Sequence, residues 1–382
     1  MPHNHYLFNY QKIEDKKELK EVYISVAIRA FAFSLVSVFV PLYLMDLGYG
    51  FNQAIIFLAI YFGALLFISP VVGYLSTKIG IKHVAVFGPM LTIIYLILLF
   101  LLPQITFSFY LVALIGSFGL AFYWIPLNSH FAKHSHKDHR GKETSYLVVG
   151  ARTVSVIAPF IGGALITSVG FNWTFIISCL IMVVAIIPLF LSYEYKSQFK
   201  YKFKDMFNKK NLPLFDDFFF HGVLVAVSVV IFPIYIFMIS NSYEITGALA
   251  TLTGLGIALS AFVVGKYTDK KGRMTMLRVG GVLNLIVWIF LMVVNNPLLV
   301  YISSFFVGFL GYSITIPLYS FFCDKLGDHE HTEFMAFREI GLSSGKAVIL
   351  LLLLFFAIET KFLVAFAFAA IASIYFIFAD LG

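Results

Sequence analysis

Long apolar runs constrain this chain more than any other feature of its sequence. They follow one another along its 382 residues, separated by short polar segments. A helix needs about 20 mostly apolar residues to cross a membrane, and these runs are continuous, unlike the alternating pattern of barrel strands. We therefore predict an all-α integral membrane protein with twelve transmembrane helices, near 23–47, 52–77, 83–103, 106–130, 144–169, 172–194, 213–240, 245–265, 275–294, 298–322, 333–358 and 361–381.

The composition excludes a soluble protein. Only 12% of the residues are charged and 60% are hydrophobic, whereas soluble domains carry roughly 25% charged residues. The first twenty-odd residues are polar and lack the short apolar segment of a signal peptide, so none is predicted. Cys179 and Cys323 lie in or beside apolar runs, which indicates neither a disulfide framework nor a metal site.

The distribution of positive charge predicts the topology. If the N-terminus is cytoplasmic, the tail and the inner loops hold 22 of the 27 lysines and arginines, and the outer loops hold only Lys361. Cytoplasmic loops of membrane proteins carry such an excess. We therefore expect both termini on the cytoplasmic side of a plasma or inner membrane. The net charge of +7 reflects this topology, so we expect no nucleic-acid partner.

The second half of the chain repeats the first. "VPLYL" around Pro41 recurs as "FPIYI" around Pro233, 192 residues later, and "IPLNS" at 125–129 recurs as "IPLYS" at 316–320, 191 residues later. Six helices per copy give both copies the same orientation, which is a parallel repeat. The predicted domains are a tail (1–22), a six-helix bundle (23–194), a basic linker (195–212) and a second six-helix bundle (213–382).

This organisation resembles the major facilitator superfamily. The family carries the pattern G-x-[LY]-x-D-[RK]-x-G-R after the second helix of a half, and the second half of this chain matches it at Gly265, Tyr267, Asp269, Lys270, Gly272 and Arg273. The first half keeps Gly73, Leu75, Lys78 and Gly80 but has Thr77 and Ile81 in place of the acid and the arginine. "APFIGG", with Pro159, Gly162 and Gly163, is similar to the fifth helix of antiporters in that family.

The resemblance implies two bundles that alternate access to a central site, with the repeated motif as a gating loop. The glycines allow a tight turn, and Asp269 can interact with a helix N-terminus as a latch. The alternative is that these charges only anchor the loop in the cytoplasm. Pro159, Gly162 and Gly163 are expected to bend the fifth helix or to let neighbouring backbones pack closely.

Ionisable residues within predicted spans are the best candidates for the site, because such residues are costly in a membrane. Arg29, Arg152, Glu339 and Lys346 are of this kind, whereas Arg338 is expected at the interface. The family resemblance implies that the first, fourth, seventh and tenth helices line the cavity. Together these considerations predict a substrate cavity of Arg29, Tyr43, Trp124, Asn128, Arg152, His221, Tyr235, Thr315, Tyr319 and Lys346.

Two groupings could carry protons. Asp217 and His221 are four residues apart on one helix face, and histidine titrates near neutral pH. Glu339 shares a face with Lys346, so the two are expected to pair. A hydrogen-bonded structural histidine is the equally weighted alternative for His221.

The sequence predicts a secondary active transporter, not an enzyme, for a small anionic or amphipathic solute. It would act as a monomer in the bilayer, with possible proton coupling and no cofactor or metal. The alternatives are an exporter of lipophilic drugs or lipids and a non-transporting receptor or scaffold. A metal exporter would rest on His134, His136 and His139, which lie in a predicted cytoplasmic loop.

Overall fold

The fold is described from a computed structural model, which covers residues 24–104, 108–134, 155–191, 203–209, 211–325 and 331–379. These residues are helical and contain no strand. Beside a helix at Ile24–Ser34, the elements of the N-terminal half are α2 (Val40–Asp46), α3 (Phe51–Gly63), α4 (Leu65–Ile79), α5 (Ile81–Leu101), α6 (Phe109–His134) and α8 (Ala158–Leu191). Those that follow are η2 (Phe203–Met206), α9 (Leu212–Ala226), η3 (Val227–Ile231), α10 (Phe232–Ser240), α11 (Tyr243–Lys271), α12 (Arg273–Val293), α13 (Pro297–Lys325), α14 (His331–Leu352), η4 (Leu353–Phe355) and α15 (Ile358–Phe378).

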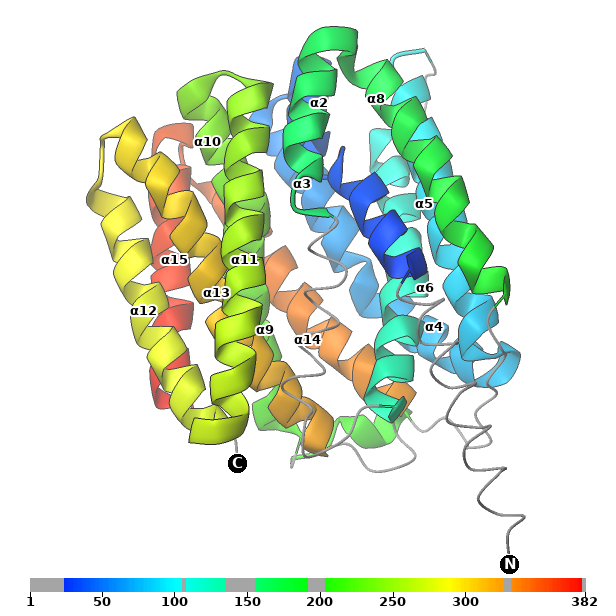
Figure 1. The fold of residues 1–382 in the computed structure, drawn as a ribbon, viewed down its shortest axis with the longest axis vertical. Coiled ribbons are helices and arrows are strands. Elements are labelled where there is room, and N and C mark those ends of the chain that lie inside the picture. Colours follow the sequence, from blue (N-terminus) through cyan, green and yellow to red (C-terminus); the bar gives the residue numbers. More distant parts are fainter. Residues whose placement is uncertain are drawn as a thin grey trace, which may run out of the picture.

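The helices form two side-by-side groups, one from each half of the chain (Figure 1). The groups meet along two seams, where α8 packs against α11 and where α14 packs against α3 and α4. On the outside of the bundle, large apolar residues such as Phe67 and Phe378 are 79% and 78% exposed. Such an apolar outer surface suits contact with lipid and is unusual for a soluble monomer.

Nine helices in the described part of the chain are long and apolar enough to cross a membrane. One of them, α8, contains a break at Gly170, whose φ of 85° allows two predicted spans to meet at a single residue. Ile24–Ser34 is shorter than a span, and α14 carries the charges that lower its hydropathy. The count of twelve therefore stays a prediction, although the all-helical membrane fold is confirmed.

The repeat is visible in the backbone. The first helix is interrupted at 35–39 and the seventh at η3 (227–231), 192 residues later, and a proline then restarts each helix. Gly80 and Gly272 end the second helix of each half with φ values of 115° and 88°. Paired helix interruptions in corresponding positions of two halves often mark the binding region of a transporter.

Polar side chains mostly donate to backbone carbonyls of their own helix, and a few donate to a neighbouring helix of the same half. The Ser25 hydroxyl donates to the Ala185 carbonyl and the Ser178 hydroxyl donates to the Ala32 carbonyl, both at 2.6 Å. In the second half the Asn284 amide donates to the Leu310 carbonyl at 2.7 Å. Small hydroxyl residues are typical of tight membrane helix packing. These contacts join helices within each half.

Candidate functional site

Arg29 is a buried cation on the first helix. Its residue is 4% exposed, and its guanidinium carbon lies 3.5 Å from the centroid of the Tyr123 ring on α6 and 5.6 Å from that of Phe33. Its Nε has no hydrogen-bond partner, and within the described residues no carboxylate forms an ion pair with it. The aromatic ring faces attract the cation but do not neutralise its charge. Arg29 is therefore suited to receive an anion.

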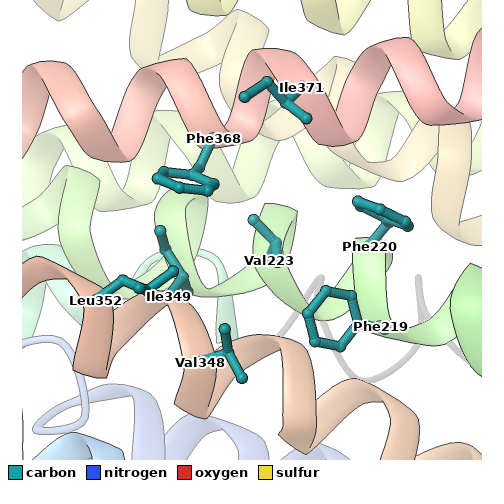
Figure 2. Close-up of a pocket in the computed structure, with 8 residues that line it drawn as sticks. All are labelled: Phe219, Phe220, Val223, Val348, Ile349, Leu352, Phe368 and Ile371. Atoms are coloured by element: carbon teal, nitrogen blue, oxygen red, sulfur yellow. The ribbon is translucent and has the colours of Figure 1, made fainter.

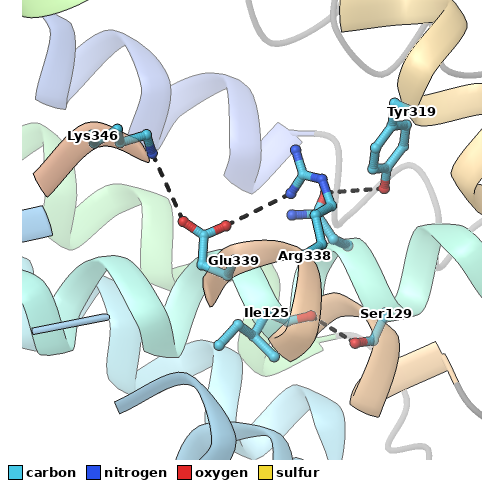
Figure 3. A network of polar contacts seen from close by, with 7 residues as sticks. Ile125, Ser129, Tyr319, Arg338, Glu339 and Lys346 are labelled. Atoms are coloured by element: carbon cyan, nitrogen blue, oxygen red, sulfur yellow. Dashed lines mark hydrogen bonds and ion pairs between the residues drawn. The ribbon is translucent and has the colours of Figure 1, made fainter. Parts of the chain in front are cut away.

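A second charged cluster lies on α14. Glu339 contacts two cations, with Arg338 Nη1 at 3.7 Å and Lys346 Nζ at 3.9 Å, as Figure 3 shows. The expected pairing of Glu339 with Lys346 is thus present. Lys346 also reaches across the boundary, because its Nζ lies 5.0 Å from the centroid of Phe62 on α3. One carboxylate shared by two cations leaves this cluster with net positive charge.

The structure encloses Arg338 within the protein, and its interfacial position in the membrane stays a prediction. Its side chain is 14% exposed, and its guanidinium carbon lies 5.0 Å from the Tyr319 ring and 5.8 Å from the Phe218 ring. Rings from α13 and α9 cover it. No sequence signal for this residue pointed to those rings, and Arg338 was missed as a site residue.

Asn128 and Tyr319 join the two halves directly. The Tyr319 hydroxyl on α13 donates to Asn128 Oδ1 on α6 at 3.2 Å, and both residues are buried. Both had been predicted to line the cavity. Their contact lies toward the helix ends that the charge distribution predicts to be cytoplasmic.

His221 and Asp217 have separate partners. His221 Nε2 lies 2.9 Å from the Thr315 hydroxyl on α13, while its Nδ1 is buried without a partner. The Tyr375 hydroxyl on α15 donates to Asp217 Oδ1 at 2.8 Å, and Asp217 Oδ2 has no partner. Among the described residues no hydrogen bond or ion pair joins the two side chains. Two predicted cavity residues, His221 and Thr315, are therefore in contact, but a direct Asp217–His221 relay is not formed.

Three aromatic candidates have local partners. Tyr43 donates its hydroxyl to the Leu99 carbonyl at 2.9 Å and packs on Phe175, inside the N-terminal half. Tyr235 packs between aromatic rings of α15. Trp124 contacts the Tyr123 ring that covers Arg29. Only Trp124 therefore adjoins the charged groups, and Arg152 lies outside the described residues.

The charged motif is mostly helix, which corrects the expected loop. Gly265 to Lys271 belong to the end of α11 and Gly73 to Ile79 to the end of α4, so each turn is reduced to Gly272 or Gly80. Positive φ lets one glycine reverse the chain. Lys78 Nζ lies 5.7 Å from the centroid of the Tyr74 ring, and Arg273 is the first residue of α12. The side chains of Asp269 and Lys270 lie outside the described part, so the latch stays a prediction.

The glycines of "APFIGG" lie at backbone contacts. A Cβ on Gly162 would come 2.0 Å from the Leu35 carbonyl oxygen in the interrupted first helix, and one on Gly163 would come 2.4 Å from the Tyr243 carbonyl oxygen on α11. The expected close packing is therefore present, and at Gly163 it forms part of the seam between the halves.

An apolar cavity of about 100 Å³ lies elsewhere, within the C-terminal half (Figure 2). Its lining residues come from α9, α14 and α15 and are all apolar: Phe219, Phe220, Val223, Val348, Ile349, Leu352, Phe368 and Ile371. It offers no charged or hydrogen-bonding side chain to a polar solute. The histidine loop that suggested a metal (His134, His136 and His139) lies outside the described side chains.

Comparisons with known proteins agree on the family. The family model for the Major Facilitator Superfamily matches residues 22–326 and 218–381. The multi-drug resistance efflux pump PmrA of Streptococcus pneumoniae, in two strains, is 25% identical over 324 residues, which are 80% of each chain.

Two solved structures are similar in fold. The human organic anion transporter MFSD10 (TETRAN) superposes with a TM-score of 0.71 at 12% identity, over 94% of this chain and 99% of that one. A bacterial homologue of the iron transporter ferroportin, in an outward-facing state, gives 0.69 at 14% identity, over 94% and 98%.

Proposed function

Because the chain belongs to the major facilitator superfamily, we propose that it moves an amphipathic organic anion across a membrane by alternating access. The substrate would bind where the two halves meet, between Arg29 and the α14 cluster. The protein would act as a monomer in the plasma or inner membrane, with both termini cytoplasmic. It would need no cofactor and would perform no chemistry on its substrate.

The imbalance of buried charge carries this proposal. Among the described residues, the three largely buried cations Arg29, Arg338 and Lys346 share one ion-paired carboxylate, that of Glu339. Removing an ion from water costs several kcal/mol even after relaxation, unless it is paired. Aromatic contacts offset part of this cost at roughly 0.5–2 kcal/mol each. An anion with an apolar body would supply the missing charge and would pack on the same aromatic rings.

Efflux of uncharged lipophilic compounds is the second candidate. The similarity to a multi-drug resistance efflux pump favours it, as do the aromatic rings around the charged groups. In this case the buried cations would serve only the packing and movement of the helices. The two candidates differ in whether ligand charge decides binding.

A matched set of three compounds distinguishes them. Naphthoate, naphthamide and naphthylmethylammonium share one aromatic body and differ in charge. We expect naphthoate to stabilise the purified protein against heat, and to be taken up by proteoliposomes, at least about tenfold more effectively than the other two. That ratio corresponds to about 1.4 kcal/mol of selective binding.

Each other outcome has a definite meaning. Equal stabilisation and flux for naphthoate and naphthamide would replace the anion proposal by lipophilic efflux. Stabilisation by naphthoate without flux, in vesicles bearing either a pH gradient or a substrate gradient, would indicate a receptor rather than a transporter.

Glu339 is our candidate for proton coupling, with Asp217 and His221 as alternatives. Protonating Glu339 would release both of its cations together, which could link proton binding to anion binding. We expect a pH gradient to drive naphthoate accumulation in the unaltered protein. Glu339→Gln should abolish this accumulation and retain downhill exchange. Accumulation that survives Glu339→Gln but not Asp217→Asn would move the role to Asp217.

A further inference from the structure

The Asn128–Tyr319 hydrogen bond joins two repeat-equivalent positions. Asn128 is the fourth residue of "IPLNS" and Tyr319 the fourth residue of "IPLYS", 191 residues later. In a parallel repeat, corresponding residues are related by rotation about an axis along the membrane normal. Two such residues touch only where both lie close to that axis. The bond therefore marks a point near the centre line between the halves.

This point lies at one end of the boundary. Asn128 is six residues before the end of α6 and Tyr319 six before the end of α13, about 9 Å along each helix at 1.5 Å per residue. Both ends are predicted to be cytoplasmic. Lys346 lies 15 residues from the start of α14, and Arg29 contacts Tyr123, which is 11 residues before the end of α6. A solute that left the site along the axis toward the predicted cytoplasmic end would have to pass between Asn128 and Tyr319.

Arg338 connects this contact to the charged cluster. Its guanidinium carbon lies over the Tyr319 ring at 5.0 Å from the centroid, and the guanidinium also pairs with Glu339, which in turn contacts Lys346 (Figure 3). The ring that Arg338 covers is therefore the same ring whose hydroxyl bonds to the opposite half. An anion that attracts Arg338 would remove the stacking contact that helps to hold Tyr319 in place.

We infer that Asn128 and Tyr319 form the inner gate of this transporter, and that Arg338 is the positioning residue through which a bound anion opens it. The gate rests only on the repeat geometry and the buried hydrogen bond. The role of Arg338 rests in addition on the proposed anionic substrate. No covalent bond changes when the gate opens. The Asn128–Tyr319 hydrogen bond and the contact of Arg338 with the Tyr319 ring are broken.

A buried reporter cysteine can measure gate opening. Ser129 is fully buried beside Asn128, so Ser129→Cys in a Cys179→Ala, Cys323→Ala background reports access from the predicted cytoplasmic side through its rate of labelling by a membrane-impermeant maleimide. Tyr319→Phe removes the gate hydroxyl and keeps the ring. Tyr301→Phe makes the same change near the other end of α13 and serves as the matched control. Ser178→Cys, buried within the N-terminal half, reports any general loosening.

We expect Tyr319→Phe to raise the labelling rate at position 129 at least about fivefold, which corresponds to roughly 1 kcal/mol for one lost hydrogen bond. Tyr301→Phe should leave it unchanged, and position 178 should stay unlabelled throughout. An unchanged rate in Tyr319→Phe would overturn the gate, whatever the substrate is. Equal increases at positions 129 and 178 would also overturn it, since both would reflect unfolding.

Labelling in the presence of naphthoate tests the role of Arg338 separately from the gate itself. Naphthoate should accelerate labelling at position 129 in the parent, and Arg338→Gln should abolish that acceleration while naphthoate still stabilises the protein. Acceleration of equal size in Arg338→Gln would remove Arg338 from the mechanism and leave the gate intact. If naphthamide accelerated labelling as well as naphthoate, the proposed anionic substrate would fail and the gate would stand.

Discussion

Arg29→Ala is expected to lower kcat/KM for naphthoate by about 30-fold or more. Removing one member of a buried charge interaction typically costs about 2–5 kcal/mol, and each 1.36 kcal/mol corresponds to a factor of ten in rate. Because Arg29 has no carboxylate partner among the described residues, its loss leaves none of their carboxylates unpaired. The cost should therefore appear in substrate binding and transport rather than in folding. Uptake kinetics in proteoliposomes measure it.

Two further variants show whether the lower kcat/KM of Arg29→Ala comes from the missing guanidinium at this position. Arg29→Lys keeps the charge but loses the planar group that stacks on the Tyr123 ring, so it should retain part of the activity. Arg278→Ala removes an exposed arginine of α12 and should transport normally. Near-normal kcat/KM in Arg29→Ala would contradict the anion site. A thermal unfolding midpoint close to that of the unaltered protein is required before any loss is assigned to binding.

The general fold could be predicted from the sequence because its causes are local or repeated. Length and hydropathy of the runs predict helices in a membrane, and the offset of 192 between Pro41 and Pro233 predicts two similar halves. The same offset relates the helix interruptions at 35–39 and 227–231. The interruptions themselves were not predicted, because a proline near a helix start is equally compatible with a continuous helix.

The candidate site was only partly predictable. The spacing of Glu339 and Lys346 along one helix predicts their pairing, since residues seven apart share a face. Tyr43 and Tyr235 show the limit: a helix that is apolar all round gives no period from which to orient it. Both rings pack within their own halves. The covering of Arg338 by Tyr319 depends on how α13 and α14 lie in space, which no pattern within one helix records.

Gly163→Ala and Gly247→Ala are expected to impair transport strongly, because both glycines lie in a seam between the halves. A Cβ on Gly163 would come 2.4 Å from the Tyr243 carbonyl oxygen, and one on Gly247 would come 2.3 Å from the Pro159 carbonyl oxygen. Both contacts lie in the seam between α8 and α11, so the added methyl group meets backbone of the other half and no flexible side chain can yield. Overpacking costs about 1–3 kcal/mol.

That cost should fall on the state in which α8 and α11 are in contact. A bias of 1–3 kcal/mol between two states changes their ratio by about 5–150-fold, so each substitution should slow transport by a factor in this range while naphthoate still binds. Gly254→Ala is the matched control on α11, because its nearest neighbour would lie at an ordinary 3.5 Å. Normal transport in Gly163→Ala and Gly247→Ala would show that this seam does not tighten during the cycle. Equal losses in all three variants would instead indicate a general intolerance of α11 to added volume.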